Sequence, residues 1–338
     1  MIIVLKEGAS KEDADAILTR IEALGLKPLY MPGQEKIVLG ALGDERVLAT
    51  LHLDSLSSVE RVVPILKPYK LANRAFHHEG SKVQVGDVLI GGGEMVVMAG
   101  PCSVEGREQI VDTAKAVKQA GARILRGGAF KPRTSPYAFQ GLEEEGLELL
   151  AVAREETGLP VVTEVMSEHD VALVSKFADM LQIGARNMQN FRLLKAVGQA
   201  GRPVLLKRGP AASLSDWLMA AEYVMSEGNL NVVLCERGVK GLFQDTRNMF
   251  DLSIIPLIRK ETHLPVVADP SHGTGVRRIV PEMALAAIAC GADGLMIEVH
   301  PEPDHAWSDG FQQLDFQEFR DLMGRARAVA AAVGRSLA

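Results

Sequence analysis

The sequence predicts an α/β protein whose larger part is a (β/α)8 TIM barrel, preceded by a small α+β domain of the ferredoxin-like type. From residue 95 onward, eight short apolar runs recur, each followed by a segment with the spacing of an amphipathic helix. These runs lack clean alternation of apolar and polar residues, which is typical of parallel strands buried on both faces. Eight such units predict a closed barrel over residues 95–338.

Residues 1–70 predict the smaller domain. Their strand and helix patterns follow the order βαββαβ, the split unit of ferredoxin-like domains. Ser10 and Asp13 have the spacing of a capping box at the start of the first helix, and a second helix is expected near 45–53. No catalytic residue types cluster here. We therefore expect this domain either to pack and assemble or to bind a regulatory ligand.

Residues 71–94 predict a linker and a hairpin between the two domains. Pro68 and the mixed polar residues after it favour an irregular segment. The stretch "SKVQVGDVLIGGGEM" then has the apolar runs and glycines of a hairpin that caps the barrel.

Composition and charge exclude several classes of protein. Of the 338 residues, 47% are apolar and 24% charged, which is ordinary for a globular enzyme and wrong for a disordered chain. The net charge of −6 argues against nucleic acid as a partner, because phosphate backbones are held by an excess of Lys and Arg. The start resembles no secretory signal, and no apolar run reaches membrane-spanning length. We therefore expect a cytoplasmic protein with no membrane partner.

Residues capable of chemistry follow every predicted barrel strand. In such barrels the active site lies where the strands end in their C-terminal loops. A single polar residue at a strand end can be explained as a member of a loop ion pair. A polar or charged residue at all eight strand ends would instead lower the stability of the fold unless a ligand paired with these groups. The ring comprises Cys102, Arg126, Glu164, Arg186, Lys207, Arg237, His272 and Glu298.

One part of this ring is cationic and predicts a site for two phosphate groups. Arg binds phosphate oxygens in bidentate fashion, and Lys acts as a point charge. In the loop "GAFKPRTSPYAFQGL", hydroxyls stand beside cations, and two prolines restrict the backbone, although a solvated basic turn would also explain that composition. The expected phosphate ligands are Arg126, Lys131, Arg133, Thr134, Ser135, Arg186, Lys207 and Arg237.

The other part predicts a metal site. Cys102, His272 and Glu298, together with Asp309, offer a thiolate, an imidazole and carboxylates, a set that suits a divalent transition metal. Such an ion would act as a Lewis acid on a carbonyl oxygen. The residues alone leave alternatives open, namely His300 and His305 as ligands and Asp304 in place of Asp309.

Seven motifs resemble the 3-deoxy-D-arabino-heptulosonate 7-phosphate (DAHP) synthase family, in the class related to 3-deoxy-D-manno-octulosonate 8-phosphate (KDO8P) synthase. The resemblance runs from about residue 85 to the C-terminus, and residues 1–70 resemble the ferredoxin-like domain that some members carry. The motifs are "AGPCSVE", "LRGGAFKPRTSPYAFQGL", "QIGARN", "LLKRG", "CERG", "DPSHGTG" and "IEVHPEP".

The resemblance implies a transferase that condenses phosphoenolpyruvate with erythrose 4-phosphate in an aldol-type reaction, the first step of the shikimate pathway to aromatic amino acids. It implies one divalent ion, such as Mn, Co, Fe or Zn, and a homo-tetramer inhibited by Phe or Tyr through the first domain. Cys102, His272, Glu298 and Asp309 fall on metal-ligand positions. Arg126, Lys131, Arg186, Lys207 and Arg237 surround phosphoenolpyruvate, with Glu164 near its reacting carbons, and Arg133, Thr134 and Ser135 take the sugar phosphate.

Among these residues, Lys131 and Glu164 are the candidates for proton transfer, the first as a proton donor and the second as a group that orients or deprotonates water. Two other functions are alternatives. KDO8P synthase performs the same chemistry on arabinose 5-phosphate, but its loop resembles "KANRTS" where this chain has "KPRTS". A ligand sensor on a retired barrel would be expected to have lost a metal ligand or a phosphate cation, and none is missing.

Overall fold

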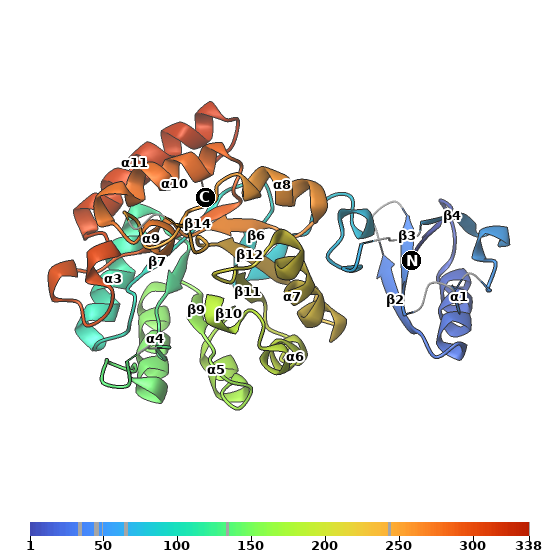
Figure 1. The fold of residues 1–338 in the computed structure, drawn as a ribbon, viewed down its shortest axis with the longest axis horizontal. Helices are drawn as coiled ribbons and strands as arrows, with labels where there is room; N and C mark the ends of the chain where they lie inside the picture. Colours follow the sequence, from blue (N-terminus) through green and yellow to red (C-terminus); the bar gives the residue numbers. More distant parts are fainter. Residues whose placement is uncertain are drawn as a thin grey trace. The chain divides into compact units, whose positions relative to one another are not determined.

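The computed structural model describes residues 1–32, 36–43, 47–48, 50–63, 67–132, 135–242 and 245–337. The chain divides into two compact units, Met1–His78 and Glu79–Ala338 (Figure 1). Among the described residues, no helix combines the length and the apolar character needed to cross a bilayer.

The first unit is a four-stranded antiparallel sheet with one described α-helix packed on it. The strand order β2-β3-β1-β4 is that of a ferredoxin-like domain, so the predicted fold class is confirmed. Ile3 and Leu5 of the sheet pack with Ile17 and Ile21 of the helix in one apolar core. The elements are β1 (Ile2–Leu5), α1 (Lys11–Ala23), β2 (Lys27–Pro32), β3 (Ile37–Leu42), the 3-10 helix η1 (Leu53–Ser55) and β4 (Val59–Val63).

Helix α1 begins with the capping box that the sequence indicates. The Ser10 hydroxyl accepts from the backbone N–H of Asp13 at 3.1 Å, and the Asp13 carboxylate accepts from the backbone N–H of Ser10 at 3.0 Å. Two otherwise unpaired donors at the helix start are satisfied in this way. The second expected helix, near 45–53, lies partly outside the described residues, since 45, 46 and 49 are not among them.

The second unit is a closed barrel of eight parallel strands, which confirms the predicted fold. Each strand pairs with the next along the chain, and the last pairs with the first, where Glu298 lies opposite Gly100. Apolar residues pointing inward fill the barrel, and those pointing outward meet the helices, which explains the unbroken apolar runs. The strands are β7 (Val96–Gly100), β8 (Ile124–Arg126), β9 (Val161–Glu164), β10 (Met180–Ile183), β11 (Val204–Lys207), β12 (Val232–Glu236), β13 (Val266–Ala268) and β14 (Gly294–Glu298).

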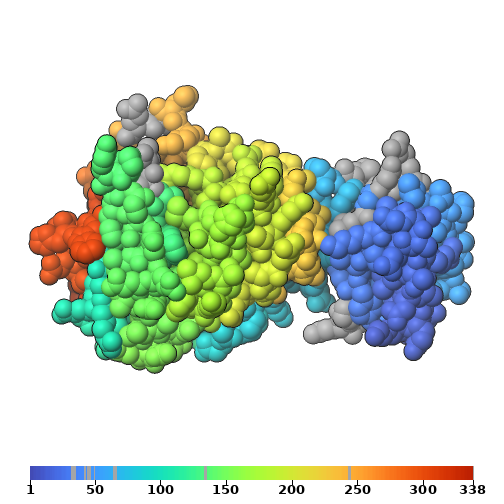
Figure 2. Space-filling view, turned by 90° about the horizontal axis from the view of Figure 1, so that it is seen from below, coloured from blue at the N-terminus to red at the C-terminus, as the bar shows by residue number. Residues whose placement is uncertain are grey.

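Helices surround the strands, as Figure 1 shows, and Figure 2 shows the green and yellow-green helices α4 to α6 forming part of the unit's outer surface. Their inward-facing residues are apolar, as Leu147 and Leu150 of α4 illustrate. The helices are α3 (Arg107–Ala120), α4 (Glu143–Thr157), α5 (Val171–Phe177), α6 (Phe191–Gln199), α7 (Leu214–Ser226), α8 (Ile254–Glu261), α9 (Pro270–Thr274), α10 (Val280–Ala289) and α11 (Phe316–Ala332).

A hairpin of β5 (Val83–Val85) and β6 (Val88–Ile90) covers the N-terminal end of the barrel. Its four apolar side chains at 83, 85, 88 and 90 belong to the same cluster as the inward-facing side chains of the strands. Gly86 lies so close to Pro160, just before β9, that a Cβ at position 86 would be 3.1 Å from the ring. The floor of the barrel is therefore filled, and the opposite end holds the cavity.

Candidate active site

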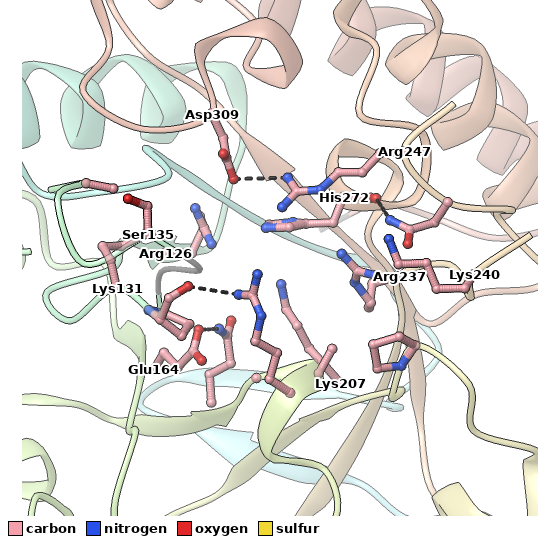
Figure 3. Close-up of a pocket in the computed structure, with 18 residues that line it drawn as sticks. Arg126, Lys131, Ser135, Glu164, Lys207, Arg237, Lys240, Arg247, His272 and Asp309 are labelled. Atoms are coloured by element: carbon pink, nitrogen blue, oxygen red, sulfur yellow. Dashed lines mark hydrogen bonds and ion pairs between the residues drawn. The ribbon is translucent and has the colours of Figure 1, made fainter. Parts of the chain in front are cut away.

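A cavity of about 420 Å³ opens at the C-terminal ends of the barrel strands (Figure 3). Several lining residues end a strand or follow one directly, for example Arg126 at the end of β8 and Lys207 at the end of β11. The residues that line it are Arg126, Lys131, Pro132, Ser135, Ala138, Glu164, Gln182, Gly184, Ala185, Arg186, Lys207, Pro210, Arg237, Lys240, Arg247, Asn248, His272 and Asp309.

Cations dominate this cavity. Of the described lining side chains, seven are Lys or Arg and two are Asp or Glu, in a chain whose net charge is −6. Figure 3 shows Lys207, Arg126 and Arg237 pointing into one shared space. The Nε atom of Arg126 is buried and has no hydrogen-bond partner in the described part of the protein. A buried donor without a partner costs free energy, so this atom is suited to receive an anionic ligand.

The predicted phosphate loop contributes Lys131 and Ser135 to the lining. Arg186, which follows β10, donates to the backbone oxygen of Pro132 at 2.8 Å. This hydrogen bond connects the loop after β8 to the segment after β10. Two predicted phosphate ligands, Arg133 and Thr134, lie outside the described residues. The other predicted phosphate ligands all face the cavity.

Lys207, Asp269 and His272 form a buried charged group on one wall. Asp269 has no exposed surface, and its Oδ2 lies 2.7 Å from Lys207 Nζ and 2.8 Å from His272 Nδ1. Its other oxygen accepts from the backbone N–H of His272 at 3.0 Å, which caps the short helix α9. Burial would raise the pKa of Asp269, but His272 and Lys207 lower it well below its ordinary value, so the carboxylate is ionised at neutral pH.

The four predicted metal ligands lie in two neighbouring pairs beside the cavity. Cys102 Sγ is 3.8 Å from Asp309 Oδ2, and His272 Nε2 is 3.5 Å from Glu298 Oε1. Cys102 and Glu298 are fully buried behind the lining residues. In the described ranges, no group of three or more His, Cys, Asp or Glu is arranged closely enough to hold a metal ion as it stands.

Three of these donors are each paired with a cation. Lys131 Nζ lies 3.1 Å from Cys102 Sγ, Arg126 Nη1 lies 2.9 Å from Glu298, and Arg247 Nη1 lies 3.0 Å from Asp309. The cations neutralise negative charge that would otherwise accumulate on neighbouring carboxylates. The donors thus have partners that a divalent ion can replace.

The ionisation states of Cys102 and His272 bear differently on metal binding: the thiol has to lose its proton to an incoming ion, whereas the imidazole can bind as it is. Burial raises the pKa of the Cys102 thiol, and Glu298 raises it further. Burial lowers the pKa of His272, against the opposite effect of Asp269 and Glu298, so its imidazole is neutral at pH 7. His272 Nδ1 lies 2.8 Å from Asp269 and Nε2 lies 3.5 Å from Glu298, and a carboxylate next to a histidine is common at metal sites. The donor set therefore fits a divalent ion chemically.

Glu164 lies at the end of β9 and faces the same cavity as His272 and Asp309 (Figure 3). Gln182 donates to its Oε2 at 3.1 Å, which fixes the orientation of the carboxylate. Gly184 leaves space for it, because a Cβ at that position would lie 2.0 Å from Glu164 Oε1.

The alternative ligands considered from sequence lie elsewhere. His300 is buried and pairs with Glu105 at 3.1 Å. His305 has a side chain 81% exposed, and Asp304 has one 91% exposed. None of these three alternatives is a described lining residue of the cavity, whereas Asp309 is.

Several residues of the site were missed from sequence. Lys240, Arg247 and Asn248 belong to the long segment after β12, and a signal was present there, since two more cations follow Arg237 within ten residues. Asp269 stands directly after a strand run, in the same position as residues that were recognised. Gln312, which donates to Glu298 at 2.6 Å, carries no charge and gave no signal.

The fold and the cavity define a (β/α)8-barrel protein with a cavity, lined mainly by cations, at the C-terminal ends of its strands. A model of the DAHP synthetase I family matches residues 68–330, and a model of the DAHP synthase ferredoxin-like domain matches residues 1–67. The chain belongs to the DAHP synthase family and is an enzyme of that transferase-type aldolase class.

Individual relatives agree with this assignment. The chain is 49% identical over 334 residues, 99% of either chain, to phospho-2-dehydro-3-deoxyheptonate aldolase of Thermotoga maritima. A crystal structure of the DAHP synthase of that organism has a TM-score of 0.80 at 48% identity and covers 100% of this chain and 99% of its own. A structure of a truncated form has a TM-score of 0.75 at 46% identity, covering 80% of this chain and 99% of its own.

More distant relatives carry a different name. The 2-dehydro-3-deoxyphosphooctonate aldolase of Magnetococcus marinus is 34% identical over 254 residues, which is 70% of this chain and 87% of its own.

Proposed function

We propose that this enzyme condenses phosphoenolpyruvate with D-erythrose 4-phosphate and water to give DAHP and inorganic phosphate, the entry to the shikimate pathway. The observation that carries the proposal is the concentration of cations in one cavity, directly beside a Cys, His, Glu and Asp donor set. The similarity to a full-length relative named as the heptonate aldolase supports the same reaction.

Phosphoenolpyruvate, with a phosphate and a carboxylate, is the substrate for the deeper cations. Arg126, Lys207 and Arg237 are buried, and burial lowers the pKa of Arg237, so an anion arriving there meets desolvated positive charge. Arg186 and Lys131 complete this group. The segment at Ser135 is left for the phosphate of the sugar. Holding both substrates by their anionic groups makes the reaction effectively intramolecular.

The bond-forming step joins C3 of phosphoenolpyruvate to the aldehyde carbon of erythrose 4-phosphate. Positive charge then develops at C2, water adds there, and phosphate leaves after the C–O bond to it breaks. Glu164 faces the cavity from the end of β9 and is the candidate that orients or deprotonates this water. Lys131 is the candidate that donates a proton to the aldehyde oxygen as it becomes a hydroxyl.

Cys102, His272, Glu298 and Asp309 would hold the divalent ion that the family resemblance implies. When bound, the ion supplies Lewis-acid polarisation of the aldehyde oxygen. Lys131 and Arg247, now on Cys102 and Asp309, would then be free to turn toward substrate. A set with one sulfur, one nitrogen and two carboxylates accepts several divalent ions, among them Mn, Co, Fe and Zn.

Phosphate release from phosphoenolpyruvate tests the reaction. The protein is loaded with Mn²⁺ and offered erythrose 4-phosphate and arabinose 5-phosphate in parallel, with a chelated sample as the control. Turnover with the four-carbon sugar alone, abolished by chelator, is the expected result. Turnover with arabinose 5-phosphate alone would assign the activity named for the Magnetococcus relative, and turnover with neither sugar would favour a ligand sensor.

The first unit is proposed to regulate the barrel. A ferredoxin-like unit appended to this enzyme class would bind Phe or Tyr between neighbouring subunits of a homo-tetramer, and binding there would be coupled reciprocally to substrate binding. Inhibition assays with Phe, Tyr and Trp, together with the mass in solution by light scattering, test both parts. A full-length enzyme indifferent to all three amino acids would rule out this regulation.

A further inference from the structure

Two consecutive glutamines, Gln312 and Gln313, lie in the segment between β14 and α11, and both have no exposed surface. Gln312 is the last residue of the 3-10 helix η6 (Gly310–Gln312), and Gln313 follows it directly. A buried carboxamide must have its oxygen and its nitrogen hydrogen-bonded, because either one left unpaired costs free energy. The partners of these two side chains therefore show what they hold in place.

Gln313 joins the segment after β7 to the segment after β14. Its Oε1 accepts from the backbone N–H of Cys102 at 2.9 Å, and its Nε2 donates to the backbone oxygen of Ser308 at 2.8 Å. The Ser308 hydroxyl in turn lies 3.1 Å from Cys102 Sγ. One side chain thus sets the distance between the thiol and the residue that precedes Asp309.

Gln312 joins the carboxylates. Its Nε2 donates to Glu298 Oε2 at 2.6 Å, which leaves Oε1 of that carboxylate facing His272. Its Oε1 accepts from Arg247 Nη1 at 2.8 Å, and the same nitrogen lies 3.0 Å from Asp309 Oδ2. Glu298 and Asp309 are therefore connected through Gln312 and Arg247.

The backbone at Asp309 needs such support. Asp309 has φ of +50°, in the left-handed region that residues other than glycine rarely adopt. The next residue, Gly310, approaches Pro303 so closely that a Cβ would lie 2.1 Å from the Pro303 oxygen. Backbone of this kind persists where surrounding contacts determine it. Gln312 and Gln313 supply buried contacts of that kind immediately after it.

We propose that Gln312 and Gln313 are positioning residues that hold Cys102, Glu298 and Asp309 in register to bind one divalent ion. The inference rests on the metal site of the proposed function and adds two residues that hold the metal ligands in position. Groups behind metal ligands typically contribute 10- to 100-fold to metal affinity. We expect an effect of that size from each glutamine.

Titration of the metal-free full-length protein with Co²⁺, followed by absorbance, tests this. Bound Co²⁺ reports its ligands through d–d bands, and a thiolate ligand adds charge-transfer absorption in the near ultraviolet. We expect Gln312→Met and Gln313→Met to raise the Kd for Co²⁺ by about 10- to 100-fold. Gln313→Met should also change the charge-transfer band, because its side chain contacts the backbone at Cys102.

Asn229→Leu is the matched control. Asn229 is also a buried carboxamide that joins two loops, donating to the Arg202 oxygen at 2.7 Å and accepting from the Asn231 N–H at 3.1 Å. It lies just before β12, at the end of the barrel opposite the cavity. We expect this variant to lose stability yet bind Co²⁺ like the wild type, which separates positioning from general destabilisation.

Wild-type affinity and spectra in both glutamine variants would overturn the inference while leaving the metal site intact. A wild-type protein that binds no Co²⁺ through Cys102 would overturn the metal site and this inference together. If the Met variants do not fold, Gln313→Glu serves instead, since it keeps the acceptor for Cys102 and loses the donor to Ser308. Unchanged Co²⁺ binding in that variant would equally contradict the role.

Discussion

Lys207 and Asp269 form an ion pair inside the barrel mouth, with Nζ 2.7 Å from Oδ2 and both side chains almost entirely shielded from water. The lysine ends β11 and the aspartate follows β13, two strands further round the barrel. Because Asp269 also faces His272, this pair connects the cation wall of the cavity with the proposed metal site.

Removing one partner of this pair should be costly. We expect Lys207→Met to lower the free energy of unfolding by about 3–5 kcal/mol, since the Asp269 charge would remain buried without its lysine partner. Differential scanning calorimetry of the metal-free protein measures the effect. The exposed pair of Lys115 and Glu156, at 2.7 Å, provides the control, and Lys115→Met should cost less than about 1 kcal/mol. Equal effects of the two substitutions would contradict the expectation.

The proposed proton transfers predict the effects of Glu164→Gln and Lys131→Met. Each should lower kcat by about 10²–10⁴-fold, the usual contribution of a general acid or base. Phosphate-release kinetics at saturating substrate gives kcat, and calorimetric titration with phosphoenolpyruvate checks that binding survives. Near-normal turnover with intact binding would remove the residue concerned from the mechanism.

Gly184→Ala should affect the same carboxylate without touching its charge. The added Cβ would lie 2.0 Å from Glu164 Oε1, so the Glu164 side chain has to move. Because that side chain is flexible and Gly184 has an ordinary negative φ of −66°, we expect a fall in kcat with little change in melting temperature. A large loss of stability, or unchanged kcat, would show that Glu164 is placed differently during catalysis.

Deleting residues 1–70 tests the regulatory proposal. We expect the shortened enzyme to keep its turnover and to lose inhibition by Phe or Tyr, because the catalytic cavity is lined only by residues of the second unit among those described. The structure of a truncated form of the Thermotoga maritima enzyme has been solved, so a shortened chain of this family can fold. Retained inhibition would place the effector site on the barrel.

The lowered pKa of Asp251 predicts that the free energy of unfolding depends on pH. Burial would raise its pKa, but the Ser253 hydroxyl and Arg208, at 3.1 Å, lower it below the ordinary value. A lowered pKa in the folded state stabilises the protein above the unfolded value of about 3.9, and this gain disappears as pH falls through the folded value. Asp251→Asn should therefore cost about 1 kcal/mol at pH 7.

The difference between wild type and Asp251→Asn should narrow as pH falls below about 4, because the wild-type carboxylate then becomes neutral too. Melting temperatures of both proteins over pH 3.5 to 7 measure it. A difference that stays constant over this range would show that Asp251 stabilises the fold by packing rather than by charge.

The barrel could be predicted from the sequence because its strands are buried on both faces and read as unbroken apolar runs. Its helices are buried on one face only, so their apolar residues recur with helical spacing. The run "LPVVTE" became β9 (Val161–Glu164), and its last residue faces the cavity as the position at a strand end requires. The recurrence of apolar runs and the rule that barrel active sites lie at the C-terminal strand ends were sufficient to predict both β9 and the position of Glu164.

Other parts of the site depend on contacts that no local pattern contains. Lys207 and Arg208 are adjacent cations, yet Lys207 points into the cavity while Arg208 pairs with Glu236 at 3.0 Å outside it. Asp269 pairs with Lys207, and Gln312 with Glu298, across more than ten residues of sequence, so the folded chain is needed to show these contacts. Sequence can give residue type and strand position, but not which of two neighbours faces inward.

The β5–β6 hairpin seals the barrel floor with apolar side chains alone, while every proposed reacting group lies at the far end. As far as the described residues show, substrates and products would therefore enter and leave at the same end of the barrel. The separation also means that exchanges among Val, Ile and Leu in this floor would change the stability of the enzyme while leaving its reacting groups untouched.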